Sequence, residues 1–300
     1  MKKIIPHLWF DKEAKQAAEF YVSAFPDSKI THTSVIKNTP SGDCDIMSFN
    51  LSGHSFMAIS AGPYFKINPS ISFMLNFDPG KDPKAKENLN KLWEKLIDGG
   101  KALMPLQEYP FSKLYGWVED KFGVTWQLIL TNPEGEERPF LVPSLLFTGA
   151  MYGKAEEAMD FYLSVFKDSK KGNVSKYGKD QGEGKEGTIM FADFNLLGNW
   201  FACMDGPGKH DFKFSEAVSF MVSCETQEEI DYYWKKLSFV PESEQCGWLK
   251  DKFGLSWQIV PTRMNEMLST GTPEQKARVT EAFMKMKKFD VATLEKAFQG

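Results

Sequence analysis

The sequence has few residues that could act as nucleophiles or metal ligands at a spacing that would activate them. The four cysteines are Cys44, Cys203, Cys224 and Cys246, and their spacing matches neither a zinc ribbon nor a redox pair. A reactive thiol needs a neighbouring base or cation, and Cys246 has no His or Arg close to it in the sequence. We therefore expect reduced, packed thiols, as is usual for a cytoplasmic protein.

A glycine-rich stretch at residues 178–187 could suggest a phosphate-binding loop. It lacks the Gly-Lys-Ser/Thr sequence and does not open a helix, so it would not direct backbone N–H groups at an anion. We expect a hairpin loop that corresponds to residues 38–43.

One motif occurs twice and is the strongest signal in the chain. It reads GWVEDKFGVTWQLI at residues 116–129 and GWLKDKFGLSWQIV at residues 247–260, and shorter matches precede both copies in the same order. The repeat is much longer than the ~20–50 residues of solenoid repeats. It therefore indicates a duplicated domain, and we divide the chain into residues 1–135, residues 136–265 and a helical tail of residues 266–300.

The elements that must position these residues follow one order. In the first copy, residues 4–10 read as a strand, Asp11 can cap a helix that ends at Phe25, and three strand-like stretches follow. The same β-α-β-β-β order begins again at residues 70–77, and twice more in the second copy. The predicted fold is thus α+β, with four such modules. Thr272 and Asp290 are expected to cap helices in the tail.

Composition and charge exclude several classes of protein. The chain has 300 residues, of which 42% are hydrophobic and 25% charged, so it can bury two cores. The net charge of −4 argues against nucleic acid or an anionic membrane as a partner. No apolar run is long enough to span a bilayer, and no signal-peptide core follows Met1, so we expect a cytoplasmic protein.

Paired modules with this motif resemble the vicinal oxygen chelate superfamily, which includes glyoxalase I, extradiol dioxygenases and bleomycin-resistance proteins. Within it, the motif Gly-Trp-x-x-Asp-Lys-Phe-Gly-x-x-Trp-Gln is similar to the PhnB-like branch, often labelled 3-demethylubiquinone-9 3-methyltransferase. The resemblance implies two cup-shaped domains of glyoxalase fold. It also implies either a monomeric pseudo-dimer or a homodimer.

The resemblance also suggests which residues line each cup. The ligand position on the first strand corresponds to His7 in the first copy and Ser144 in the second, and the position on the last strand to Gln127 and Gln258. Strand alternation places Trp9 on the same face as His7. The predicted ligand pocket is therefore His7, Trp9, Gln127 and Gln258.

Two kinds of function remain open. Catalytic metal sites usually need three His or carboxylate ligands, and His7 with Gln127 supplies only one of that type. The leading hypothesis is a protein that binds a small, largely apolar molecule without a complete metal site or other cofactor. The alternative is a metal-dependent isomerase, lyase or dioxygenase, with a divalent metal at His7 and Gln127. A methyltransferase is not expected, because the first strand–helix junction, Phe10-Asp11-Lys12-Glu13, lacks the glycine-rich turn of S-adenosylmethionine sites.

Overall fold

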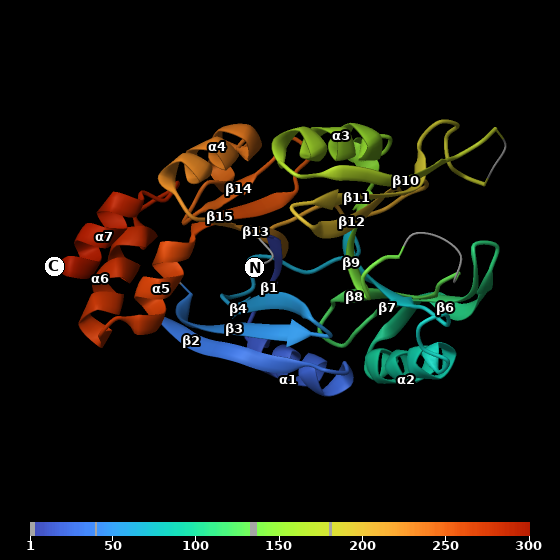
Figure 1. The fold of residues 1–300 in the computed structure, drawn as a ribbon, viewed down its shortest axis with the longest axis horizontal. Coiled ribbons are helices and arrows are strands. Elements are labelled where there is room, and N and C mark those ends of the chain that lie inside the picture. Colours follow the sequence, from blue (N-terminus) through green and yellow to red (C-terminus); the bar gives the residue numbers. More distant parts are fainter. Residues whose placement is uncertain (1–3, 40, 133–136, 180–181) are drawn as a thin grey trace. The chain divides into compact units, whose positions relative to one another are not determined.

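The computed structural model describes residues 4–39, 41–132, 137–179 and 182–300. The predicted α+β class with glyoxalase-like β-α-β-β-β modules is confirmed (Figure 1). Two compact units make up the chain: residues 1–7 with 218–300, called the terminal unit, and residues 8–217, called the central unit. The predicted domain boundaries at 135/136 and 265/266 stay a prediction.

The central unit holds most of the first module and all of the second and third. The first module begins with β1 (Ile4–Phe10), which passes from the terminal to the central unit, and continues with α1 (Ala14–Ala24), β2 (Lys29–Thr39), β3 (Gly42–Leu51) and β4 (His54–Ser60). The second consists of β5 (Ile71–Phe77), α2 (Ala85–Ile97), β6 (Lys101–Tyr109), β7 (Ser112–Glu119) and β8 (Thr125–Leu130). The third consists of β9 (Leu141–Phe147), the short η1 (Gly149–Met151), α3 (Ala155–Val165), β10 (Lys170–Lys176), β11 (Ile189–Leu196) and β12 (Asn199–Asp205).

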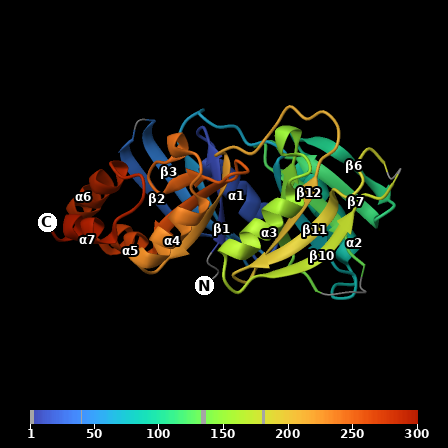
Figure 2. The same ribbon diagram turned by 90° about the horizontal axis from the view of Figure 1, so that it is seen from above.

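The second and third modules share one eight-stranded sheet, in the order β10-β11-β12-β9-β5-β8-β7-β6. Its centre joins the two repeats, because β5 of the first copy pairs antiparallel with β9 of the second, from Ile71 opposite Leu145 to Leu75 opposite Leu141. The sheet curls into two arms, with α3 outside strands β10–β12 and α2 outside strands β6–β8 (Figures 1 and 2). We call the helix-free side of this sheet the inner face.

Strand alternation decides which side chains reach each face. Phe73, Trp126 and Leu145 lie on the helix side and are almost completely buried. The ring of Trp126 packs against Tyr21 and Phe25, with ring centroids 5.3 and 5.0 Å away, so this Trp belongs to the core. Their strand neighbours Met74, Gln127 and Ser144 therefore lie on the inner face.

The terminal unit contains the fourth module in a shortened form. It consists of β13 (Val218–Cys224), α4 (Gln227–Leu237), the short η2 (Pro241–Ser243), β14 (Trp248–Lys250) and β15 (Ser256–Pro261). Residues 238–247 are all described and form η2 where the second module has strand β6, so this module keeps three strands.

The C-terminal tail takes part of the place of that strand. It forms α5 (Thr262–Thr270), α6 (Pro273–Met284) and α7 (Val291–Gln299), which contact one another. Between α6 and α7 the backbone approaches the repeated motif: the N–H groups of Cys246 and Gly247 donate to the carbonyls of Met286 and Lys287, at 2.8 Å each. The tail is thereby hydrogen-bonded to the residues that precede β14.

The predicted helix caps are correct in the tail and wrong at the first helix. Thr272 forms a complete capping box with Gln275, and Asp290 accepts from the backbone N–H of Thr293. Asp11, by contrast, does not cap α1. The backbone N–H of Ala14 donates instead to the hydroxyl of Ser60, which β4 brings to the start of this helix.

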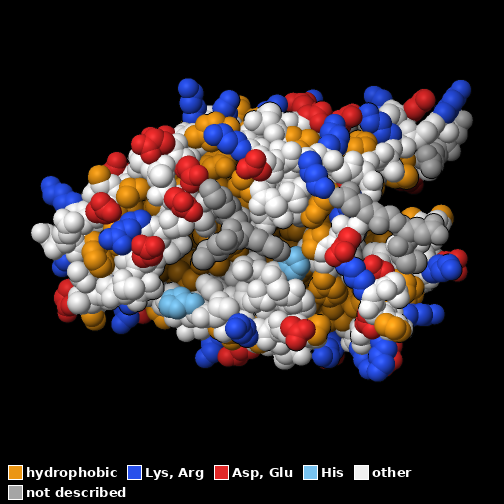
Figure 3. All heavy atoms as spheres, in the orientation of Figure 1, with side chains coloured by type: hydrophobic (Ala, Val, Ile, Leu, Met, Phe, Trp, Pro, Cys, Tyr) orange, Lys and Arg blue, Asp and Glu red, His pale blue; other side chains and the backbone are white. Residues whose placement is uncertain are grey.

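The surface mixes both signs of charge. On the face shown in Figure 3, Lys and Arg side chains are interspersed with Asp and Glu, in keeping with the small net charge of −4. None of the helices formed by the described residues combines the length and the apolar character needed to cross a membrane.

Candidate functional site

Gln127 is the centre of a hydrogen-bonded row on the inner face. Its side chain is 3% exposed; its amide nitrogen donates to the hydroxyl of Ser72 at 2.7 Å, and its amide oxygen accepts from the hydroxyl of Tyr115 at 2.8 Å. Burial raises the pKa of Tyr115, so this hydroxyl stays protonated and remains a donor at neutral pH. Both ends of the amide are therefore fixed by the protein.

Two buried donors beside this row have no partner among the described residues. They are the hydroxyl of Ser144 and the indole Nε1 of Trp117. Ser144 lies opposite Ser72 in the β5–β9 pairing, and Trp117 lies opposite Gln127 in the β7–β8 pairing. A buried donor without an acceptor costs about 1–3 kcal/mol, so this face is suited to an acceptor that the described residues do not supply.

The rest of the inner face is largely apolar. Met74, Val142 and Ala202 form a buried cluster that brings together strands β5, β9 and β12. Three partly buried side chains pack against it, Ile129, Phe191 and Trp200. The face therefore combines an apolar surface with a few fixed polar groups, which is the usual composition of a small-molecule site.

An arginine from the connection between the repeats reaches the same face. Arg138 Nε lies 2.7 Å from Asp193 Oδ2, and both side chains are mostly buried. The second donor, Nη2, lies 3.2 Å from Oδ1, and the guanidinium stacks 3.9 Å from the ring centroid of Trp200. This bidentate pair holds the connection against strand β11.

The terminal unit carries the corresponding residues of the other copy. The amide nitrogen of Gln258 donates to the hydroxyl of Ser219 at 2.9 Å, as Gln127 does to Ser72. His7 is 4% exposed and meets Trp248 edge-on, with ring centroids 5.5 Å apart. Its Nδ1 is buried without a partner among the described residues, and burial lowers its pKa to about 4, so the imidazole is neutral at physiological pH.

The predicted pocket residues thus fall in two places. His7 and Gln258 lie in the terminal unit, on strands of one sheet, whereas Gln127 lies in the central unit on the other sheet. Trp9 lies near the end of β1, where its Nε1 donates to the carbonyl of Gly62 at 2.8 Å and its ring packs against Phe65. The two residues predicted to bind a metal, His7 and Gln127, therefore lie on strands of different sheets.

The donor set does not fit the divalent metal that the superfamily implies. On the strands next to Gln127 and beyond them, the inner face carries the hydroxyls of Ser72 and Ser144 and the thioether of Met204, whereas Asp193 on this face is held by Arg138. Asp205 is occupied by the backbone N–H groups of Gly153, Ala155 and Ile189. Among the residues that the structure describes, no group of three or more His, Cys, Asp or Glu is arranged to hold a metal ion.

The Asp of the repeated motif, Asp120 in the first copy and Asp251 in the second, is buried, although charged neighbours in the sequence are typical of a solvated turn. Asp120 is 3% exposed and Asp251 is fully buried. Asp120 accepts from the hydroxyl of Tyr21, the indole of Trp126 and two backbone N–H groups of its own turn. Burial raises its pKa to about 6, although these four donors favour the charged form. Its role is to join α1, the turn and β8.

Two other candidates remain structural. The Cys246 thiol lies within 3.9 Å of the carbonyls of Phe283 and Met284, and burial raises its pKa, which disfavours the reactive thiolate. In the glycine-rich stretch, Asp180 and Gln181 lie outside the described residues. Its described part is bonded to neighbouring protein groups: the N–H of Gly187 donates to the carbonyl of Tyr177, and the N–H of Lys185 donates to the hydroxyl of Tyr152.

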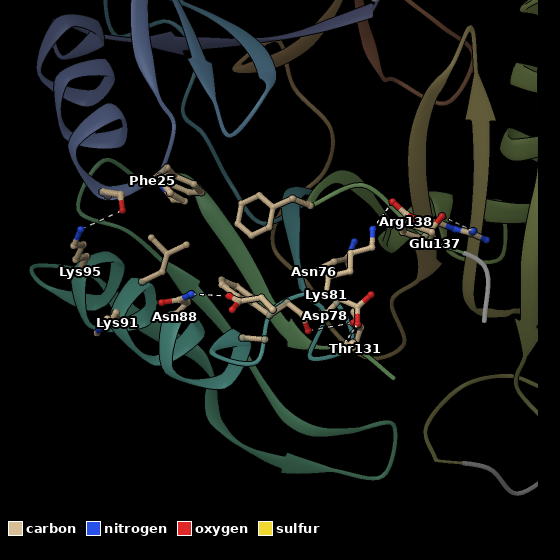
Figure 4. Close-up of a pocket in the computed structure, with 18 of the residues that line it drawn as sticks. Phe25, Asn76, Asp78, Lys81, Asn88, Lys91, Lys95, Thr131, Glu137 and Arg138 are labelled. Carbon is tan, nitrogen blue, oxygen red and sulfur yellow. Dashed lines mark hydrogen bonds and ion pairs between the residues drawn. The ribbon is translucent and has the colours of Figure 1, made fainter. Parts of the chain in front are cut away.

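A cavity of about 860 Å³ opens in the central unit beside the ends of α1, β5 and β8 (Figure 4). Its four cationic residues have protein partners: Lys81 pairs with Glu137, Lys91 with Glu87, Arg138 with Asp193, and Lys95 with the carbonyls of Ser23 and Ala24. The described lining therefore shows no preference for a charged ligand.

The resemblance to the superfamily pointed to Gln127 as a pocket residue and to Ser144 as the counterpart of His7, but two features were missed. Trp117 could have been noticed, because Trp248 repeats it in the second copy. The pairing of Arg138 with Asp193 has no local signal, because the two residues are far apart in the sequence.

The chain is similar to known proteins in both copies of the repeat. The model of the family described as 3-demethylubiquinone-9 3-methyltransferase matches residues 2–129 and again residues 139–260. A solved protein from Bacillus cereus, described as a putative 3-demethylubiquinone-9 3-methyltransferase and PhnB protein, is 34% identical; the match covers 42% of this chain and 98% of that one, with a TM-score of 0.38.

A longer match is weaker in sequence. Glyoxalase I from Zea mays is 11% identical over 89% of this chain and 96% of its own, with a TM-score of 0.52, and so indicates a shared fold. No curated protein shows significant similarity to the chain.

Proposed function

We propose that this protein binds a small, largely apolar molecule on the inner face of the eight-stranded sheet. The chain belongs to the 3-demethylubiquinone-9 3-methyltransferase family and has the glyoxalase fold. The observation that carries this proposal is the pair of buried donors Ser144 Oγ and Trp117 Nε1, which have no partner in the part of the chain that the structure describes. A ligand oxygen that accepts from either donor would recover the cost of burying it.

The surroundings of these donors favour an uncharged ligand with an apolar body. Met74, Val142 and Ala202 offer only hydrocarbon and thioether surface. Arg138, which reaches this face, is already paired with Asp193 and stacked on Trp200, so its charge is compensated by the protein. A ketone, ester or ether on an apolar skeleton matches this combination of groups.

Binding is favoured over the two enzymatic alternatives on chemical grounds. Hydroxyls, an amide fixed at both ends and a thioether do not form the His and carboxylate set of a catalytic divalent metal. The family's methyltransferase description is not supported by the start of the fold either, because the β1–α1 junction has no glycine-rich turn.

The test compares matched ketones and hydrocarbons by isothermal titration calorimetry. The ligands are 2-acetylnaphthalene and cyclododecanone, with 2-ethylnaphthalene as the partner that lacks the oxygen. We expect at least one ketone to bind with one-to-one stoichiometry. Ser144→Ala or Trp117→Phe should weaken that ketone about threefold to tenfold and leave the hydrocarbon unchanged, which corresponds to one hydrogen bond.

Ser34→Ala, at an exposed position of β2, is the control and should bind as the wild type does. Ser144→Ala should not destabilise the free protein, because this hydroxyl has no hydrogen-bond partner among the residues that the structure describes. If no ketone binds, or if both variants bind the ketones like the wild type, the proposal is wrong.

A further inference from the structure

Three aromatic rings form a cluster at the tip of the β6–β7 hairpin, and only one of them, Tyr115, is known from the contacts above to hydrogen-bond to Gln127. Tyr109 and Phe111 are stacked, with centroids 5.6 Å apart and planes at 17°. Tyr115 meets both rings edge-on, at 5.6 Å from Tyr109 and 5.0 Å from Phe111. We call these residues the hairpin cluster.

The cluster presents an aromatic surface to solvent in a fixed orientation. Phe111 is 62% exposed, although a hairpin tip needs no large apolar side chain. The ring of Tyr109 is held in place by its hydroxyl, which donates to the carbonyl of Pro105 at 3.1 Å. Single exposed apolar residues are ordinary on protein surfaces, but an ordered stack with an exposed ring resembles half of a stacking site.

The cluster is continuous with the inner face. Tyr115, its buried member, is 6% exposed and donates to Gln127. Trp117 lies two residues further along β7 and therefore on the same face, and its buried Nε1 has no partner within the described residues. An aromatic surface thus runs from the exposed ring of Phe111 to the buried indole N–H.

The other copy of the repeat does not have this surface. Cys246 occupies the position of Tyr115 in the motif, and the described residues before it form η2 in place of a β6-like strand. The hairpin cluster therefore belongs to the central unit and is not a general requirement of the module.

We infer that the hairpin cluster is a stacking site, and that the ligand is a planar, conjugated ring system carrying a hydrogen-bond acceptor. This inference rests on the proposed function and narrows it from any apolar ligand to a flat aromatic one. The ring stacks on Phe111 and Tyr115, since aromatic pairs prefer offset or edge-on contacts. Its oxygen accepts from Trp117 Nε1.

The experiment uses the full chain and the same calorimetric assay. Cyclododecanone has the same number of carbon atoms as 2-acetylnaphthalene and the same ketone, but it is not planar. We expect the wild type to bind 2-acetylnaphthalene more tightly than cyclododecanone. Phe111→Ala should weaken the binding of 2-acetylnaphthalene by about twofold to tenfold, which corresponds to one aromatic contact, and should leave the binding of cyclododecanone unchanged. Phe111→Tyr should restore the binding of 2-acetylnaphthalene.

Tyr64→Ala is the matched control, because Tyr64 is 64% exposed and does not belong to the cluster. Trp117→Phe should weaken 2-acetylnaphthalene but not 2-ethylnaphthalene. If both ketones bind equally and Phe111→Ala changes neither, while Ser144→Ala still weakens a ketone, the stacking inference fails and the proposed function stands. If neither ketone binds at all, both fail.

Discussion

His7 should make the free energy of unfolding depend on pH, and the substitution His7→Gln should remove this contribution. The imidazole is 4% exposed, its Nδ1 has no partner among the described residues, and burial lowers its pKa from 6.5 to about 4. In the unfolded chain the same group takes up a proton near pH 6.5.

The sign and size of the effect follow from these two values. Between pH 6.5 and 4 the unfolded state binds more protons than the folded state, so the free energy of unfolding falls as the pH is lowered through this window. Each pKa unit corresponds to about 1.4 kcal/mol, so His7 alone should cost the fold about 3 kcal/mol at pH 4 relative to pH 7.

Urea unfolding, followed by circular dichroism at several pH values from 7 to 4, measures this contribution. Subtracting the curve of His7→Gln from that of the wild type cancels the carboxylates that titrate in the same range. The difference should change by about 3 kcal/mol across the window. Ser34→Ala, at an exposed position of β2 and without a titratable group, should retain the wild-type pH dependence. Parallel curves for the wild type and His7→Gln would refute the reasoning.

Three further substitutions test the contacts that hold the fold. Arg138→Ala strips the buried Asp193 of its bidentate partner and should cost about 3–5 kcal/mol in urea unfolding, whereas Lys154→Ala, in an exposed pair, should cost less than about 1 kcal/mol. Tyr21→Phe removes one hydrogen bond to the Asp120 carboxylate and should lower the unfolding free energy by about 1.5–3 kcal/mol; no change would exclude that bond as a stabilising contact. Gly247→Ala places a Cβ 2.4 Å from the ring of Phe289, so the tail should detach and be cleaved near residues 284–290 in limited proteolysis. Gly254→Ala is the control: Gly254 has a similar φ, but its Cβ would meet open space, so the tail should stay protected from cleavage.

The fold could be predicted from the sequence because the repeated motif and the strand periodicity agree. Local pattern could not show how the modules combine: the pairing of β5 with β9 depends on residues in different repeats, and periodicity within one strand carries no information on its neighbour.

Gln127 and Ser144 were located in the sequence by the resemblance to the superfamily, and strand register places both on the inner face. The burial of Asp120 could not be predicted, because the flanking charges suggest solvent. It becomes understandable only when Tyr21 and Trp126 are seen to donate to this carboxylate. A clue was present, since Asp stands in both copies of the motif while the preceding residue changes from Glu119 to Lys250.

The antiparallel seam between β5 and β9 has a consequence for how this protein can vary. A chain with a single repeat could build such a seam only from two identical molecules, so every substitution would appear on both sides of it. Here the two sides are encoded separately, and each can change alone. The imidazole at position 7 and the hydroxyl at position 144 illustrate this freedom: linking the copies covalently allows one to specialise while the other keeps a different chemistry.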